Sequence, residues 1–261
     1  MQVETDAGAL RGRVDDGVVR FLGVPFAAPS LGSLRFSRPQ PVPHWRGVRD
    51  ALERRPAAPQ PPTIGVGVRG AAATSEDCLY LNVFAPASYG SARPVLVWIH
   101  GGGYVHGDGG DPLFDGGRLA LAQDCVVVAL NYRLGLWGFV PFTDRNVGLA
   151  DQIAALEWVS RNAVAFGGDP DNVTVIGESS GAMSVCNLLA SPVARPLFHR
   201  AIAQSGAANH VATRAQADET AAIARAELGC DPRDAQIEQL LAAQRGTIRR
   251  LRPSHHTNPL R

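Results

Sequence analysis

The segment "GESSG" at 177–181 places two serines between two glycines, where an apolar stretch gives way to a helix-like one. The spacing G-x-S-x-G is typical of a nucleophilic serine on a sharp strand-to-helix turn, so Ser179 is predicted to expose its hydroxyl. Gly177 and Gly181 lack side chains that would collide at such a turn. Ser180 is then predicted to begin the helix and to direct its main-chain N–H toward a developing oxyanion.

Such a short pattern also occurs by chance in ordinary glycine-rich turns, so its context matters. The strand-like "VTVI" precedes it and the helix-like "AMSVCNLLAS" follows it, as the motif requires. A second motif, "HGGGY" at 100–104, follows another apolar segment and is typical of the loop that supplies further oxyanion donors. We therefore predict Gly102 and Gly103 as donors. A phosphate-binding loop is the rival interpretation, but the glycine and lysine spacing that it needs is missing.

The elements that must position these motifs alternate between strand-like and helix-like segments. Near-continuous apolar runs predict buried strands at 79–86, 94–100, 125–132 and 172–178. The clearest helix is predicted at 146–166 from the three-and-four spacing of its apolar residues. The alternation predicts an α/β fold with a mainly parallel central sheet and helices on both faces.

The other segments of the chain show weaker strand and helix patterns. The run at 17–27 is predicted as strand at an edge and not in the core, and 39–62 as irregular because it is rich in proline. A further apolar run occupies 199–206, and helices are predicted at 215–228 and 235–243.

Composition excludes several classes of function. The 25 basic and 24 acidic residues leave a formal charge of +1, which gives no electrostatic reason to expect a nucleic-acid partner. The sequence shows no apolar stretch of membrane-spanning length and no signal peptide, so we expect a cytoplasmic protein without a membrane partner. Its 4 cysteines form no CxxC pair, which argues against a zinc site and favours reduced thiols.

Six segments of the sequence, taken in order, resemble those of a known protein family. They are "GVPFAAP" at 23–29, "SEDCLYLNV" at 75–83, "VWIHGGGY" at 97–104, "NYRLGLWGF" at 131–139, "GLADQIAALEWVSRN" at 148–162 and "AFGGDPDNVTVIGESSGAMSV" at 165–185. Together they resemble the type-B carboxylesterases, the family that includes the cholinesterases, within the α/β-hydrolase superfamily. The resemblance extends over residues 1 to about 244.

The resemblance implies an α/β-hydrolase fold in which Ser179 is the acyl-forming nucleophile, with the N–H groups of Gly102, Gly103 and Ser180 as the oxyanion hole. It implies that Glu178 tunes the electrostatics of the nucleophile and that His100 orients the glycine loop. Two structural ion pairs are also implied, Arg35 with Glu76 and Arg133 with Asp169. Cys78 and Cys230 fall where secreted relatives form disulfides, but neither has a partner at the family spacing, so free thiols are expected.

A serine nucleophile also needs an acid and a histidine, which follow it in this superfamily. In the family they lie beyond the matched segments, so we expect a chain truncated after its N-terminal half, with the later strands and both residues missing. His255 and His256 follow candidate acids, but they lie in the Arg-rich segment 245–261, which is predicted to be a disordered tail outside the domain of residues 1–244. The abrupt composition of this segment is typical of a changed reading frame or an early end of the coding sequence.

These features predict hydrolysis of a small-molecule carboxylic ester through an acyl-enzyme on Ser179, without a cofactor or metal. Two alternatives remain open, a catalytically incomplete fragment and a non-enzymatic, cholinesterase-like binding protein. Trp137, Phe139 and Phe142 either line a substrate pocket or belong to the core. Acyl and alcohol preference and the oligomeric state do not follow from the sequence.

Overall fold

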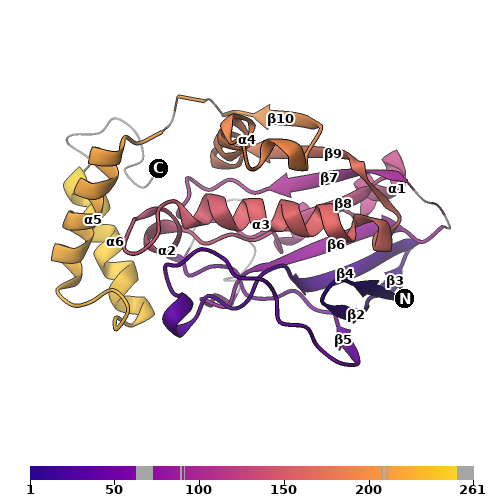
Figure 1. Cartoon of the computed structure of the whole chain (residues 1–261), viewed down its shortest axis with the longest axis horizontal. Coiled ribbons are helices and arrows are strands. Elements are labelled where there is room, and N and C mark those ends of the chain that lie inside the picture. Colours follow the sequence, from indigo (N-terminus) through magenta and orange to yellow (C-terminus); the bar gives the residue numbers. More distant parts are fainter. Residues whose placement is uncertain (63–72, 89, 91, 207, 210, 252–261) are drawn as a thin grey trace.

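The computed structural model describes residues 1–62, 73–88, 90, 92–206, 208–209 and 211–251 (Figure 1). Its centre is a seven-stranded sheet in the order β10-β9-β7-β8-β6-β4-β3, and a smaller sheet has the order β1-β2-β5. The large sheet consists of β3 (Arg13–Asp15), β4 (Val18–Pro25), β6 (Tyr80–Pro86), β7 (Arg93–Ile99), β8 (Val126–Leu130), β9 (Gly168–Glu178) and β10 (Arg200–Gln204). The small sheet consists of β1 (Gln2–Thr5), β2 (Gly8–Arg11) and β5 (Val48–Asp50).

The large sheet is parallel where it carries the predicted motifs. The strands β10, β9, β7 and β8 pair in parallel, whereas β6, β4 and β3 join the other side antiparallel. The prediction of a parallel sheet therefore describes the half that contains the motifs. The carboxyl ends of β7 and β9 meet at one edge of this half, and both motifs follow those ends.

Helices cover both faces of the sheet, with α1 (Gly117–Gln123) on one face and α3 (Val147–Asn162) and α4 (Ser180–Ala190) on the other. The helices α2 (Gly135–Phe139), α5 (Arg214–Leu228) and α6 (Ile237–Leu251) form a second core at one end of the molecule (Figure 1). Alternate residues of β8 show the two faces. Val126 and Val128 join the core that contains Leu156 of α3 and Val185 of α4, whereas Val127 packs with α1 on the opposite face.

The prediction that the strand at 17–27 lies at an edge and outside the core was wrong. β4 is almost entirely buried and lies between β6 and β3, so it belongs to the core, and the edge is the short strand β3. The reason is that β4 pairs with β6 over nearly its whole length, and both faces of this pair are covered. The proline-rich segment forms only β5 within an otherwise irregular course.

The segment 245–251 corrects the prediction of a disordered tail. It continues α6, which packs against α5 at one end of the molecule (Figure 1). Thr247 and Leu251 are buried in line with Leu240, so an amphipathic pattern continues through the arginines. Arg250 adds an ion pair with Glu227 of α5 at 2.6 Å. The rest of the predicted tail, 252–261, with His255 and His256, lies outside the described residues.

The two implied ion pairs have different outcomes. Arg35 does bond Glu76, with Nε donating at 2.6 Å, and this pairing is confirmed. Arg133 does not pair with Asp169. It donates from its main chain, Nε and Nη2 to Asp151, a fully buried residue of α3, because the guanidinium is buried inside the fold beside that carboxylate.

All four cysteines are free, as expected, and Cys78 is buried. In the part of the chain that the structure describes, no helix is long and apolar enough to cross a membrane.

Candidate active site

Ser179 lies at the junction of β9 and α4, and its backbone is strained. Its φ of 53° and ψ of −119° are a conformation that side-chain-bearing residues rarely adopt. Main-chain hydrogen bonds hold the residue in place, because its N–H donates to Gln204 O at 2.9 Å and its carbonyl accepts from Met183 N at 3.0 Å. The Ser179 side chain makes no capping hydrogen bond to α4 and is partly exposed, so its hydroxyl remains available.

The first turn of α4 packs unusually closely on the end of β7. A Cβ atom added to Gly181 would lie 2.1 Å from Ile99 O and 2.9 Å from His100 O. Any other residue at this position would therefore overlap a neighbouring main chain. Ser180, the first residue of the helix, is completely buried there. The turn predicted from the glycines is present, for the physical reason that was predicted.

The loop that follows β7 comes directly beside this turn. A Cβ atom on Gly101 would lie 3.3 Å from Ser179 Cβ and 2.8 Å from Glu178 Oε2. Gly102 and Gly103 have φ values of 110° and 62°, in the region that favours glycine. Gly102 also closes a tight turn, since its carbonyl accepts from Val105 N and His106 N. The structure thus brings the predicted glycine loop and the predicted serine together.

His100 and Tyr132 form a floor beneath the loop. The two rings stack with centroids 4.4 Å apart, and the Tyr132 hydroxyl donates to His100 O at 2.9 Å. The Nδ1 atom of His100 is 2.8 Å from Gly101 O, and because a carbonyl only accepts, Nδ1 must carry the hydrogen. Burial lowers the pKa of His100 to about 4, so the ring is neutral at pH 7. These contacts agree with a role in orienting the loop.

Two residues around the loop were not predicted from the sequence. Tyr132 follows β8, which is the parallel neighbour of β7, so the adjacency of the two strand ends was a usable signal. Gln60 offered no such signal. From a distant part of the chain, its side-chain amide exchanges two hydrogen bonds with the main chain of Gly107, shortly after the loop.

The triad acid and histidine are not identified among the described residues. His199 accepts from Val173 N at 3.2 Å at the start of β10, whereas Ser179 lies beside the end of that strand. Burial lowers the pKa of His106, whose ring bonds the backbone of Pro61, and His44 is exposed. Among the acidic residues that follow Ser179 in the chain, Asp218 pairs with Arg145 and Glu227 with Arg250. His210, like His255 and His256, lies outside the described residues.

A cavity of about 350 Å³ lies close to the loop, and Tyr104 and Ser184 are part of its lining. Of the three aromatic residues considered from the sequence, Phe139 lines this cavity. Trp137 is buried in the core between α2 and the α5–α6 pair, where its indole N–H donates to Glu76. Phe142 belongs to that core and also lines a smaller cavity away from the loop. Among the described residues, no group of three or more His, Cys, Asp or Glu could hold a metal ion.

Comparison with known proteins decides the family. The model of the carboxylesterase family matches residues 1–250. The chain belongs to the carboxylesterase family. It is 44% identical to para-nitrobenzyl esterase of Bacillus subtilis over 245 residues, which are 91% of this chain and 50% of that protein. It is 48% identical to phenmedipham hydrolase of Pseudarthrobacter oxydans over 206 residues, covering 77% of this chain and 42% of the relative.

Solved structures agree with this assignment. A thermophilic para-nitrobenzyl esterase superimposes with a TM-score of 0.93 at 42% identity, covering 98% of this chain and 55% of the other. The fold is therefore that of the α/β-hydrolases, as predicted. The family model extends past residue 244, in agreement with the helical structure of 245–251. The chain spans about half the length of the curated relatives that it matches.

Proposed function

We propose that this protein hydrolyses carboxylic esters through an acyl-enzyme formed on Ser179. The observation that carries the proposal is the strained backbone of Ser179 at the junction of β9 and α4, with a side chain beside the glycine loop that makes no capping hydrogen bond to the helix. Such strain persists only where the surrounding structure enforces it, and here it projects one hydroxyl from the end of a buried strand. Membership of the carboxylesterase family supports the same reaction.

The oxyanion of the tetrahedral intermediate would be stabilised by the main-chain N–H groups of Gly102, Gly103 and Ser180. Supporting this assignment, Gly102 and Gly103 adopt positive φ values next to Ser179, and Ser180 occupies the N-terminus of α4, where the helix dipole favours negative charge. Glu178 would adjust the electrostatics of the nucleophile from the adjoining position. His100 would act by holding the loop, with no part in proton transfer.

The substrate would be a small-molecule ester. The name of one relative, para-nitrobenzyl esterase, points to such a compound. The cavity beside Tyr104 is large enough to accept part of a molecule of this class. Phe139 and Leu149 give it an apolar wall, which suits the acyl or alcohol group of an ester.

A catalytically incomplete esterase is the second candidate function. It is favoured by one observation, that the described residues include no identified partner to take the proton from Ser179. Turnover would then be low, although main-chain donors alone preserve some rate in serine hydrolases that lack triad residues. A purely binding protein has less support, because a strained serine has no use without covalent chemistry.

Hydrolysis of p-nitrophenyl butyrate by the purified chain tests the proposal. The variant Ser179→Ala removes the nucleophile, and Ser160→Ala, which removes an exposed hydroxyl of α3, is the matched control. We expect release of p-nitrophenol by the wild type and the control and background release by Ser179→Ala. Intact mass spectrometry after rapid quenching should show a butyryl adduct in the same two proteins. Equal rates in all three proteins, with no adduct, would refute the proposal for this chain.

A further inference from the structure

The three proposed oxyanion donors belong to two separate segments of the chain. Gly102 and Gly103 lie in the loop after β7, whereas Ser180 begins α4. The two segments approach each other closely, since a Cβ atom on Gly101 would lie 3.3 Å from Ser179 Cβ. Such contacts limit how near the segments come, but each is too weak to prevent them from separating. A set of donors that spans two segments therefore benefits from an attractive bond between them.

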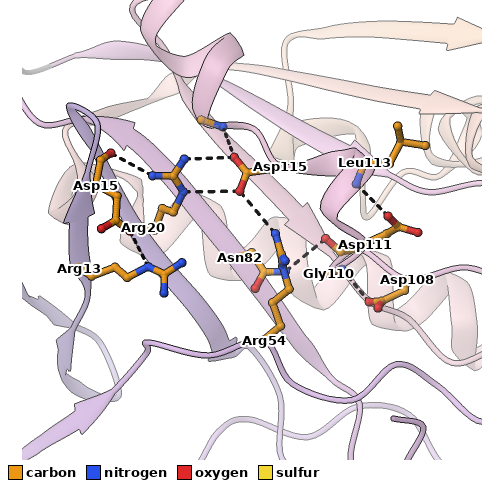
Figure 2. A network of polar contacts seen from close by, with 12 residues as sticks. Arg13, Asp15, Arg20, Arg54, Asn82, Asp108, Gly110, Asp111, Leu113 and Asp115 are labelled. Atoms are coloured by element: carbon orange, nitrogen blue, oxygen red, sulfur yellow. Dashed lines mark hydrogen bonds and ion pairs between the residues drawn. The ribbon is translucent and has the colours of Figure 1, made fainter. Parts of the chain in front are cut away.

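The far end of the loop, at Gly109 and Gly110, is anchored to the sheet. The Asn82 amide on β6 donates to Gly109 O at 3.2 Å, and Gly110 N donates to the carboxylate of Asp108 at 2.6 Å (Figure 2). A Cβ atom on Gly109 would also lie 2.4 Å from Leu130 O at the end of β8. These contacts hold the far end of the loop relative to β6 and β8. The near end, which carries the proposed donors, needs a contact of its own with α4.

A side-chain hydrogen bond joins the near end of the loop directly to α4. Ser184 lies one turn after Ser180, and its Oγ atom donates to the hydroxyl of Tyr104 at 3.2 Å. Tyr104 directly follows Gly103 in the chain. Both side chains are buried, with Ser184 1% and Tyr104 3% exposed, so water has little access to compete for this bond. The bond therefore connects the two segments that carry the proposed donors.

Gln152 of α3 sets the direction of this bond. Its Nε2 atom donates to Ser184 Oγ at 3.0 Å, so the serine oxygen accepts from Gln152 and its hydrogen is directed to Tyr104. Gln152 is fully buried, and its Oε1 atom has no hydrogen-bond partner among the described residues. A buried oxygen without a partner costs stability, which a methionine of similar shape would not. The glutamine therefore favours the orientation of Ser184 over the stability of the core.

Packing does not enclose Tyr104 on every side. Its ring contacts that of Phe139, with centroids 4.5 Å apart, but it also lines the cavity of about 350 Å³ together with Ser184. A ring beside a cavity lacks packing neighbours on that side, so its position depends more strongly on its polar contacts. Loss of the hydrogen bond from Ser184 would give Tyr104, and with it the near end of the loop, room to move away from α4.

We propose that Ser184 is a positioning residue that holds the glycine loop against the start of α4, and that Gln152 orients its hydroxyl for this bond. The catalytic part rests on the proposed function, because the alignment of the donors matters only if Ser179 forms an acyl-enzyme. Neither Ser184 nor Gln152 touches the reacting atoms in this proposal. They act by keeping the N–H groups of the loop and of α4 directed at one point, where the oxyanion develops.

Conservative variants of the full chain test the proposal. Ser184→Ala and Tyr104→Phe each remove one partner of the bond, and the double variant removes both. Gln152→Met removes the amide but keeps the length of the side chain. The matched control is Ser30→Ala. Ser30 is also buried, at 4% exposure, and its hydroxyl donates at 2.7 Å to Glu76 O, which belongs to neither segment.

Amide hydrogen exchange measures the connection between the segments without the need for activity. The peptides that cover 100–104 and 179–183 report on the loop and on the start of α4. We expect each single variant of the bond and Gln152→Met to raise exchange in both peptides by about fivefold, the factor that corresponds to one ordinary hydrogen bond. The double variant should exceed neither single variant, because both remove the same bond. Ser30→Ala should leave both peptides at the wild-type rate.

Hydrolysis of p-nitrophenyl butyrate measures the consequence for catalysis. In Ser184→Ala, Tyr104→Phe and Gln152→Met, kcat should fall by about tenfold, because the donors act on the oxyanion and not on the bound ester. KM should change by less than about twofold. Gln152→Met gives the sharpest result, because its free energy of unfolding in urea should not fall although its kcat does. A residue with a merely structural role would not separate rate from stability in this way.

The remaining outcomes separate the two proposals. Faster exchange in both peptides, without hydrolysis that depends on Ser179, would retain the connection between the segments and refute the proposed function. Hydrolysis that depends on Ser179, with unchanged exchange or with an unchanged kcat in Ser184→Ala, would retain the function and overturn the positioning role. Additive effects in the double variant, or the same effects in Ser30→Ala, would also overturn it. If circular dichroism shows that Ser184→Ala is unfolded, Tyr104→Phe decides, since it preserves the ring.

Discussion

The turn at 177–181 and the loop at 101–103 both lie beside Ser179, but they are held in place by different contacts. The turn is fixed by main chain against main chain, because Gly177 meets Gly181 and Gly181 meets Ile99 O without space for a side chain. The loop also has close main-chain contacts, because a Cβ atom on Gly102 would lie 2.2 Å from His106 O, but in addition it rests on the stacked rings of His100 and Tyr132. Added bulk should therefore damage both segments, whereas loss of a side-chain hydrogen bond or a change of charge should affect the loop alone.

The largest effect is expected from Gly181→Ala. The new methyl group would lie 2.1 Å from Ile99 O, which belongs to β7 and cannot move without disturbing the sheet. We expect the free energy of unfolding to fall by about 3 kcal/mol or more. Urea denaturation followed by fluorescence measures this change.

The matched control is Gly229→Ala at the end of α5. Gly229 has a φ of 70° but no atom within 4 Å of an added Cβ, so only backbone strain of about 1 kcal/mol is expected there. If Gly181→Ala were no more destabilising than this control, close main-chain contact would not be what fixes the turn.

A smaller effect is expected from the titration of His100 under the loop. Its pKa in the folded protein is about 4, below its ordinary value of 6.5, because burial disfavours the charged ring. The unfolded chain therefore binds a proton at this residue below pH 6.5, while the folded protein does so only near pH 4. Its contribution is complete above pH 6.5 and is lost as the pH falls, by about 2 kcal/mol between pH 7 and pH 5.

Comparison with His100→Gln isolates this contribution. Free energies of unfolding measured at several pH values should fall more steeply for the wild type than for the variant across this range. Other groups, including His106 with its lowered pKa, titrate in both proteins and cancel in the difference. Parallel curves would contradict this prediction. They would mean that His100 binds a proton equally well in the folded and unfolded states, so that burial does not lower its pKa.

The turn was also the more predictable of the two segments from sequence. Its glycines and serines are contiguous, and the strand and helix around them have strong apolar patterns, so local spacing determined Ser179, Ser180 and Gly181. The strands of the parallel half were predictable for the same reason. The side-chain contacts of the loop and of the residues that follow it join parts far apart in the chain, such as Gln60 with Gly107, and no local pattern encodes such pairs.

Two wrong predictions have the same physical origin. Arg133 was expected to pair with Asp169, but the buried partner is Asp151, because the packing of α3 on the sheet decides which carboxylate meets the guanidinium. In α6 the arginines concealed a buried stripe, since Leu240, Thr247 and Leu251 are buried while Arg245 and Arg249 are exposed. The arginine content of the segment reflects the exposed side of α6, whereas the spacing of its buried residues would have predicted a helix.

The smallest effect is expected from Tyr132→Phe, which removes one hydroxyl from beneath the loop. His100 O would lose the hydrogen bond that it accepts at 2.9 Å, at a cost of about 1 kcal/mol in the free energy of unfolding. The control is Tyr80→Phe, which removes the bond from Tyr80 to Asp77, also 2.9 Å long, at a site without contact to the loop. The two variants should be similar in stability.

Amide hydrogen exchange distinguishes the two variants where stability does not. The peptide that contains residues 100–104 should exchange faster in Tyr132→Phe and at the wild-type rate in Tyr80→Phe, because only the first variant loosens the carbonyl from which the glycine loop starts. Unchanged exchange in both would mean that ring stacking and the bond from His100 to Gly101 hold the loop without the hydroxyl. In that case the loop, like the turn, would be fixed by packing, and the contrast between them would lie in the kind of atom in contact.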